Sequence, residues 1–480
     1  MAPGDYRVVA QRTGFSAHPI LTDESGHAIS ALSLASGQVV TGSQLWFTPD
    51  ASISGKVLGP DGEPLANAEV VLIARKWQRG KRVYVEADNA NTGDGGIFHF
   101  SAVPAGRYWV YAGRPRQGPL AFTILDGPNS TETRIAGRYY PNASQLDAAA
   151  PIEIAAGGEI SGIDFKLPVA PLFHITGAYS GKGSTITLAE RYGDQVLTWS
   201  EHGAVFGKDG RFETTGVAGN YFLFSSESTQ HDQFTGAKVP VTVATHDVAD
   251  IVVPPVARFE LRGRIRSDGD PPDGKLPVRI FCDGGEADAY TSAQRQAEPQ
   301  TDGTFSIADL TPDRYTIRIA NVDTGKEGGY YLKSVRVGGV EAVGGAIDLS
   351  QGAVENVELV LSAVVGGMEG TVIPAEEEAG GEPADVTLVA ISLKTNFGDA
   401  APVTAYLDPA GHFRVTDLQP GTYRIFAVPA YDSGLWQNPE FLGQIADRGV
   451  TVNITEGAAT KVQVHALRAS EIRQVEERIE

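Results

Sequence analysis

The chain has 480 residues and a formal net charge of −20, with 39 Lys and Arg against 59 Asp and Glu. Because the phosphates of nucleic acids are bound by clustered Lys and Arg, this excess of negative charge argues against a nucleic-acid-binding protein. The single cysteine, Cys282, excludes an intrachain disulfide and zinc sites made of Cys-x-x-Cys pairs. At about 150 residues per domain the length predicts roughly three domains. No apolar run is long enough for a transmembrane segment, so we expect none.

The first 50 residues are predicted to form only part of a folded unit. Residues 3–10, from Pro3 to Ala10, match the second strand of a pattern that recurs later, but no opening strand precedes them. Met1 is not followed by a basic and then apolar leader. Either a partner segment completes this unit, or the chain is a truncated piece of a longer protein that carried the export signal. We favour the truncated piece.

One pattern of turns and aromatic residues then recurs four times. A Gly-containing turn leads to a Phe, a second turn follows, and a Tyr opens an alternating strand. Ten residues separate Phe from Tyr in three copies, and nine in the second copy. The pairs are Phe98 and Tyr108, Phe212 and Tyr221, Phe305 and Tyr315, and Phe413 and Tyr423. We expect each pair to mark a β-hairpin whose Phe and Tyr strands lie side by side.

A glycine in a short strand precedes each pair, at Gly55, Gly177, Gly263 and Gly370. The interval between copies, roughly 100 residues, suits one β-sandwich of about seven strands. The predicted fold is all-β, a tandem array of Ig-like or prealbumin-like Greek-key β-sandwiches. The predicted units are a partial sandwich at 1–50, sandwiches at 51–169, 170–256 (the weakest copy), 257–362 and 363–468, and a charged tail at 469–480 that forms a short solvent-exposed helix.

Residues 53–72 resemble the opening of carboxypeptidase regulatory-like domains. That family has a Gly-x-Val strand, here Gly55-Lys56-Val57, and then a Gly-x-Pro-Leu-x-x-Ala turn, here residues 62–68. The resemblance covers most of residues 51–466 and extends to large bacterial surface proteins built from such repeats. It implies a transthyretin-like, or carbohydrate-binding-like, Greek-key sandwich that is generally not catalytic itself.

The usual catalytic motifs do not occur in the sequence. None of the nine His residues has a Glu three positions later, and Gly-x-Ser-x-Gly is missing. Residues 268–274 resemble a calcium loop, but Pro takes a ligand position, so a polar turn is the simpler interpretation. We therefore expect no enzyme, no catalytic residue, no metal and no cofactor.

Aromatic side chains are the candidates for ligand binding, because sugar rings stack on Trp and Tyr. The carbohydrate-binding candidates are Trp77, Tyr139, Tyr140 and Trp436. Trp77 lies in the basic segment 75–82 of an acidic protein. This segment is either an edge strand protected by cations, which we favour, or a contact for an anionic glycan or partner. The other three lie on predicted loops, where packing against the protein is favoured over binding.

The function predicted from these features is that of a non-catalytic extracellular or cell-envelope repeat protein. Its sandwiches act as spacers and binding surfaces, with a polysaccharide or another surface polymer as partner. The alternative is an accessory segment of a larger metallocarboxypeptidase or outer-membrane receptor whose working domain lies outside this chain. The location outside the cytoplasm is implied by the family resemblance.

Overall fold

The computed structural model describes most of the chain from residue 44 to residue 479. The internal gaps are 114–131, 182–183, 201, 207–209, 229–232, 236–237, 256, 270–275, 285–294, 323–328, 376–385, 394–401, 409–410 and 430–431. Before residue 44 it describes residues 4–6, 12–22, 28–29, 32–34, 37 and 39. The all-β prediction is confirmed, with the helices α1 (Pro439–Ile445) and α2 (Ala469–Arg478) added near the C-terminus.

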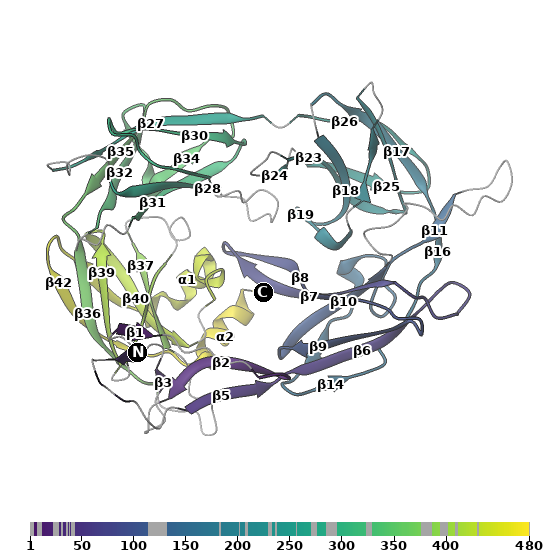
Figure 1. Cartoon of the computed structure of the whole chain (residues 1–480), viewed down its shortest axis with the longest axis horizontal. Coiled ribbons are helices and arrows are strands. Elements are labelled where there is room, and N and C mark those ends of the chain that lie inside the picture. The colour runs from purple at the N-terminus through teal and green to yellow at the C-terminus, as the bar shows by residue number, and fades with distance from the viewer. Residues whose placement is uncertain are drawn as a thin grey trace.

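Four hydrophobic cores follow one another along the chain. Their residues come from the stretches 51–167, 175–253, 261–361 and 368–464, and we call the corresponding two-sheet units sandwiches I to IV. Figure 1 shows that the sandwiches are arranged as a closed ring rather than as an extended row. Sandwich IV thus returns to sandwich I, and α1 and α2 lie inside the ring (Figure 1).

The N-terminal region is followed by sandwich I, which contains the longest strand of the chain's described part, β8 (Lys81–Asn91). The N-terminal strands are β1 (Gly4–Tyr6) paired with β4 (Leu32–Leu34), and β3 (Ala28–Ile29), β2 (Phe15–Thr22) and β5 (Gln44–Pro49) in one sheet. In sandwich I, one sheet contains β9 (Ile97–Val103), β6 (Ala51–Leu58), β14 (Glu159–Ile160) and β15 (Phe165–Lys166). The other contains β8 (Lys81–Asn91), β7 (Glu69–Gln78), β10 (Gly106–Gly113), β12 (Arg138–Tyr139) and β13 (Ile152–Ile154).

Sandwich II follows a two-stranded connection of β11 (Thr133–Ile135) and β16 (Val169–Pro171). Its first sheet contains β21 (Val205–Phe206), β22 (Arg211–Gly216), β17 (Phe173–Tyr179) and β26 (Val248–Val253). Its second sheet contains β19 (Gln195–Val196), β20 (His202–Gly203), β18 (Ser184–Tyr192), β23 (Gly219–Ser228), β24 (Gln233–Thr235) and β25 (Val239–Val243).

Sandwiches III and IV repeat this arrangement. One sheet of III contains β30 (Thr304–Leu310), β27 (Phe259–Ser267), β35 (Val357–Ser362), β32 (Tyr331–Val337) and β33 (Val340–Glu341). Its other sheet contains β29 (Arg295–Ala297), β28 (Val278–Gly284), β31 (Arg314–Asn321) and β34 (Ala346–Asp348). One sheet of IV contains β39 (His412–Leu418), β36 (Gly366–Ile373) and β42 (Ala459–His465). Its other sheet contains β38 (Val403–Tyr406), β37 (Val386–Ser392), β40 (Gly421–Pro429) and β41 (Val450–Ile454). The short 3-10 helices are η1 (Leu146–Ala148), η2 (Thr198–Ser200), η3 (Val343–Gly345), η4 (Leu435–Gln437) and η5 (Ala446–Arg448).

The repeated Phe and Tyr strands belong to opposite sheets, so the predicted β-hairpin is wrong. In sandwich IV the Phe strand β39 pairs with β36, whereas the Tyr strand β40 pairs with β37. The other three sandwiches pair their strands in the same way. The turn therefore carries the chain from one sheet to the other. The sequence did not show this, because alternation reports which side chains point inward and not which strands pair.

The shorter spacing in sandwich II corresponds to a missing β-bulge. In sandwiches I, III and IV the register between the first strand and the Phe strand shifts by one residue. A residue with positive φ stands beside each shift, at Ala102 (φ 60), Asp309 (φ 59) and Asp417 (φ 60). In sandwich II the pairing of β17 with β22 is continuous. The tenth residue of the other copies is thus the extra residue that defines a bulge.

The repeated tyrosine closes the turn between the two sheets. In every copy its hydroxyl donates to the backbone carbonyl four residues upstream. The bonds join Tyr108 to Pro104 (2.9 Å), Tyr221 to Val217 (2.9 Å), Tyr315 to Thr311 (3.1 Å) and Tyr423 to Gln419 (2.9 Å). This contact is the tyrosine corner of Greek-key sandwiches, and it explains why the Tyr recurs.

Replacing Tyr423 by Phe is expected to lower the free energy of unfolding by about 1 kcal/mol, because the Gln419 carbonyl loses its donor. Burial raises the pKa of Tyr423 to about 12, so the phenol stays protonated and able to donate over the pH range of ordinary experiments. Urea denaturation of the purified chain measures the loss. An unchanged unfolding curve would contradict a stabilising role for this hydroxyl.

The repeated glycine lies directly opposite the repeated phenylalanine. The register pairs Gly55 with Phe98, Gly177 with Phe212, Gly263 with Phe305 and Gly370 with Phe413. A Cβ at any of these glycines would meet a backbone carbonyl of the segment that runs beside it on the other side, and would also approach the Phe ring. Both landmarks of the sequence repeat therefore describe one packing contact, in which the ring covers a glycine that must lack a side chain.

Candidate functional site

A long β-hairpin projects from sandwich I toward the middle of the ring (Figure 1). Ala74 of β7 is the last residue that pairs with β10, at Tyr108, and beyond it β7 pairs with β8. We call residues 75–84 the arm. Its turn consists of Arg79 (φ 48) and Gly80 (φ 76), both with the positive φ that a tight type I′ hairpin requires.

The tip of the arm is hydrogen-bonded to sandwiches III and IV. The backbone N–H of Gly80 donates to the carbonyl of Gly434 at 2.9 Å, and the Asn438 side-chain amide donates to the carbonyl of Gly80 at 2.8 Å. Arg79 donates to the carbonyl of Gly284 in sandwich III. The basic segment singled out in the sequence is therefore an intramolecular docking element.

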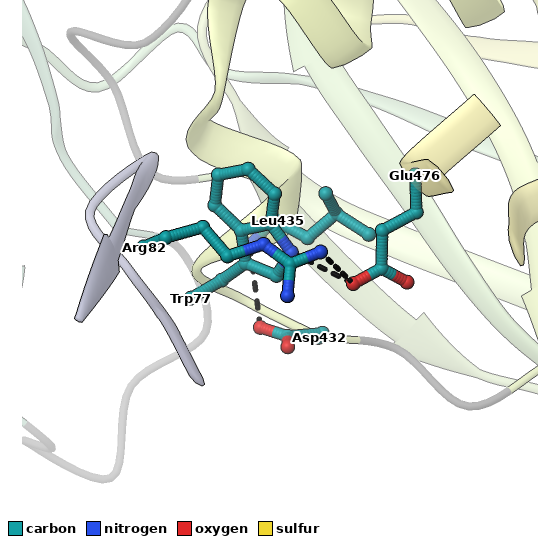
Figure 2. Close-up of polar contacts among 5 residues, drawn as sticks. All are labelled: Trp77, Arg82, Asp432, Leu435 and Glu476. Atoms are coloured by element: carbon teal, nitrogen blue, oxygen red, sulfur yellow. Dashed lines mark hydrogen bonds and ion pairs between the residues drawn. The ribbon is translucent and has the colours of Figure 1, made fainter. Parts of the chain in front are cut away.

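Trp77 and Arg82 of the arm meet one acidic residue of α2, as Figure 2 shows. The Trp77 Nε1–H donates to Glu476 Oε1 at 2.8 Å, and Arg82 bonds the same oxygen at 3.1 Å. The guanidinium carbon of Arg82 lies 4.5 Å from the centre of the Trp77 ring, within cation–π range. The Arg82 and Glu476 side chains are only 22% and 29% exposed, so this pair is partly shielded from water.

The arm docks beside a second hydrophobic layer of sandwich IV. The sheet containing β37 and β40 faces the main core on one side, while its other face is covered by η4, α1 and α2. Trp436 is 1% exposed in this layer, with its ring centre 5.0 Å from that of Phe426 and 5.2 Å from that of Phe441. Partly buried Trp77 packs against the same layer.

The C-terminal helix differs from its prediction. Residues 469–478 form α2, as expected from the sequence, but Ile472 is buried against the outer layer of sandwich IV. The helix is therefore a packed element and not a solvent-exposed tail. Its apolar side covers the sheet, and Glu476 on the same helix bonds to the arm.

Sandwich I also has a buried interface with sandwich II. One hydrophobic cluster combines residues from both sandwiches, namely Val71, Ile73, Tyr84, Trp109, Tyr139, Leu146, Leu197 and Trp199. The Gln195 side chain accepts from the backbone N–H of Tyr84 and donates to its carbonyl. Apolar burial and paired backbone groups together fix sandwich I against sandwich II.

A short chain of polar groups crosses this interface. The Trp199 Nε1–H donates to the Tyr139 hydroxyl at 3.0 Å, and that hydroxyl donates to Glu190 Oε2 at 2.9 Å. Desolvation raises the pKa of Glu190 to about 7, although Tyr139 and the positive charges of Arg134 and Arg138 act in the opposite direction. Burial also raises the pKa of the Tyr139 phenol, which therefore stays a hydrogen-bond donor at neutral pH.

The pKa of Glu190 predicts a pH-dependent stability. The folded value of about 7 lies above the unperturbed 4.5, so between these values the folded chain holds the proton more tightly. The resulting stabilisation is complete below 4.5 and is lost as the pH rises through 7. We expect about 1 to 3 kcal/mol less stability at alkaline pH from this group, the lower part of the range allowing for partial solvent screening.

Urea denaturation at pH 5.5 and pH 8 measures this effect. The Glu190→Gln variant keeps an acceptor for Tyr139 without a titrating group, so its stability should change less between the two pH values. At pH 8 it should also be the more stable protein. Equal pH dependence in the variant and the wild-type chain would show that Glu190 does not cause the effect.

The four aromatic candidates do not share one exposed surface. Tyr139 is 0% exposed and faces sandwich II, and Trp436 is buried under sandwich IV. Tyr140 is partly buried against the core of sandwich I, with its ring centre 6.1 Å from that of Phe165. Only Trp77 and Trp436 are brought together. Stacking on a sugar needs an open ring face, which the burial of Tyr139 and Trp436 denies them.

Glu190 is the residue that the sequence analysis missed. It lies at the end of the apolar run of β18 and pairs with Tyr221, where the equivalent residues of the other sandwiches are Ala74, Gly284 and Ser392. A charged residue at this otherwise small position was the available signal. Its partner Tyr139 lies 51 residues away in another sandwich, which the sequence does not show.

Other features of the described residues add no catalytic arrangement. Cys282 is 0% exposed, and desolvation raises the pKa of its thiol to about 12. Within the described part of the chain, no three His, Cys, Asp or Glu side chains are grouped so that they could hold a metal. Most of the calcium-like loop, residues 270–274, lies outside the described residues. None of the described helices has the length and apolar character needed to cross a membrane.

Comparison with protein families identifies part of sandwich I. A family model described as "Carboxypeptidase regulatory-like domain" matches residues 52–136, which include Gly55, Phe98 and Tyr108. Residues 52–136 are thus similar to the carboxypeptidase regulatory-like domain family. The strands β13, β14 and β15, which complete both sheets of sandwich I, follow the segment that the family model matches.

Comparisons with whole proteins give weaker similarities. No curated protein matches the chain. Among solved structures, the Bacillus anthracis TIE protein is 9% identical, with a TM-score of 0.17 over 84% of this chain and 69% of that one. BcpA, the major pilin subunit of Bacillus cereus, is 9% identical, with a TM-score of 0.17 over 86% and 98%. The RrgB pilus protein of Streptococcus pneumoniae is 9% identical, with a TM-score of 0.16 over 88% and 99%. Such low TM-scores carry no conclusion about function.

Proposed function

We propose that this chain is a non-catalytic structural protein of the cell envelope whose sandwiches form one closed ring. The observation that carries the proposal is the double anchoring of sandwich I. It packs against sandwich II through the cluster around Tyr139 and docks onto sandwich IV through the arm. Units joined only by linkers would reorient freely, whereas two interfaces on one sandwich hold its neighbours in fixed positions.

The use of the polar side chains supports the same proposal. Trp77 and Arg82 bond to Glu476, and Trp199 bonds to Tyr139, which bonds to Glu190. The hydrogen bonds of these groups join different sandwiches, so the side chains hold the sandwiches together. The carboxypeptidase regulatory-like domain in sandwich I points in the same direction, since the sequence resemblance implies a domain that is generally not catalytic.

Binding of a polysaccharide or another surface polymer by this ring stays a prediction. The geometry leaves Trp77 and Tyr140 as its partly exposed candidates. The role of an accessory segment of a metallocarboxypeptidase or an outer-membrane receptor likewise stays a prediction, which no observation on the described residues favours.

Surface labelling of intact cells tests the proposed location. Val340 is 72% exposed, whereas the natural Cys282 is 0% exposed. A Val340→Cys variant, produced in the organism that makes the protein, should react with a membrane-impermeant maleimide before lysis, and the wild-type chain should not. Labelling of the variant only after lysis would overturn the location. Hydrolysis of peptide C-termini by the purified chain would overturn the non-catalytic role.

A further inference from the structure

The contacts of the arm join sandwich I to sandwiches III and IV and so close the ring. They join residues far apart in sequence, such as Trp77 and Glu476, which are 399 positions apart. Elsewhere the ring is held unevenly. Sandwiches I and II share a hydrophobic cluster, whereas no cluster of the described residues combines II with III, or III with IV. In the sequence, only residues 254–258 separate β26 of sandwich II, which ends at Val253, from β27 of sandwich III, which begins at Phe259.

In this arrangement the junction of sandwiches II and III can act as a hinge, and the contacts of the arm with III and IV act as a latch that holds the ring closed. A rotation of sandwich II relative to sandwich III moves sandwiches I and II, which share a packed interface, away from III and IV. Of the described contacts between these two halves, those of the arm must break. The arm and its docking surface are then both free to engage a second molecule, without unfolding of any sandwich.

The docking surface fits this particular hairpin closely. A Cβ on Gly80 would lie 2.5 Å from the carbonyl oxygen of Gln437, and a Cβ on Gly434 would lie 2.2 Å from the carbonyl oxygen of Trp77. Both distances are far below normal van der Waals contact, so the two backbones approach as closely as glycine allows. A hairpin with a side chain at the position of Gly80 would not fit, which favours the chain's own arm as occupant.

Charge points to the same occupant. Residues 75–82 hold five cations, Arg75, Lys76, Arg79, Lys81 and Arg82, in a chain of net charge −20. Two such chains repel each other overall, and the arm presents a concentrated positive segment that an acidic copy attracts. At the docking surface, the acidic Glu476 forms an ion pair with Arg82.

We propose that the arm is an exchange element whose second partner is another copy of this chain. In the exchanged dimer, the arm of each copy docks between η4 and α2 of the other, and the contacts of the arm with sandwiches III and IV are formed in trans, while those of Tyr84 with sandwich II stay within one chain. Exchange of identical elements costs little because the contacts are unchanged, although the closed ring wins at low protein concentration through its high effective concentration. The inference goes beyond the proposed function and does not depend on it.

Charge reversal separates docking within a chain from docking between chains. In the Arg82→Glu variant and in the Glu476→Arg variant, the arm and its own docking surface carry like charges, so each ring is expected to open. When the two variants are mixed, the arm of the Glu476→Arg chain keeps Arg82 and meets Glu476 on the Arg82→Glu chain. The reciprocal contact pairs the two introduced charges.

Light scattering after size-exclusion chromatography gives the readout. Each variant alone should have the mass of a monomer, and an equimolar mixture should contain a species of twice that mass. A mixture that stays monomeric over a range of concentrations would overturn the proposal, as would equal dimerisation of each variant alone. The Arg82→Glu/Glu476→Arg double variant is the control for folding and should regain the monomeric, compact wild-type scattering profile. Failure to regain it would also count against the proposal.

Discussion

Replacing Gly370 by Val is expected to unfold sandwich IV. A Cβ at this position would lie 1.7 Å from the carbonyl oxygen of Val462 and 3.1 Å from the Phe413 ring. The Val462 carbonyl belongs to β42, which runs parallel to β36 in register over seven residues from Gly367 to Ile373, so it cannot retreat without breaking that pairing. We expect a loss of at least about 3 kcal/mol in the free energy of unfolding.

Chemical denaturation measures this loss, and hydrogen exchange locates it in sandwich IV. Gly443 in α1 offers a matched control, since a Cβ there meets nothing within 4 Å. The Gly443→Ala variant should be neutral or more stable by up to about 1 kcal/mol, because Ala is the better helix former. If the Gly370→Val variant behaved like this control, the close approach of the carbonyl would not be the reason for the repeated glycine.

Replacing Trp436 by Ala is expected to cost about 3 to 5 kcal/mol of stability, the range for truncating a buried Trp. The side chain is 1% exposed and fills the space between Phe426 of the sheet and Phe441 of α1. Its removal leaves a cavity in the outer layer of sandwich IV. Since Trp77 packs against the same layer, we also expect the arm to detach and the ring to expand.

Two measurements distinguish this structural role from sugar binding at Trp436. Urea denaturation reports the stability, and small-angle X-ray scattering reports the radius of gyration of the ring. The Trp436→Phe variant keeps most of the packing and should lose much less than the Trp436→Ala variant. Unchanged stability together with reduced polysaccharide binding in the Trp436→Ala variant would instead indicate an exposed binding platform.

The sequence predicted the repeated framework because its signals are local and periodic. Gly370, Phe413 and Tyr423 recur with their counterparts at similar spacings, and alternation around them reports which side chains face a core. The same signals did not distinguish a hairpin from a turn between sheets, because both place Phe and Tyr inward. The spacing of nine residues in sandwich II was visible, but its cause appeared only in the register of β17 with β22.

The exposure of the aromatic residues was outside the reach of sequence patterns. Trp436 follows a loop-like segment, and its burial depends on α1 and on the outer face of a sheet whose inner face already packs on a core. Tyr139 is covered by residues of a different sandwich. A residue's own neighbours in sequence say little about such second-layer packing.

By itself, the sequence determined that this protein is built from repeated all-β sandwiches, since the pattern of Gly, Phe and Tyr occurs once in each of the four copies. Only the tertiary structure decided that the sandwiches close into a ring and that Trp77 and Arg82 bond to Glu476. The physical reason is the range of the interactions. Framework contacts join residues within one folding unit, whereas the bond between Trp77 and Glu476 joins side chains 399 positions apart whose pairing depends on the path of the whole chain.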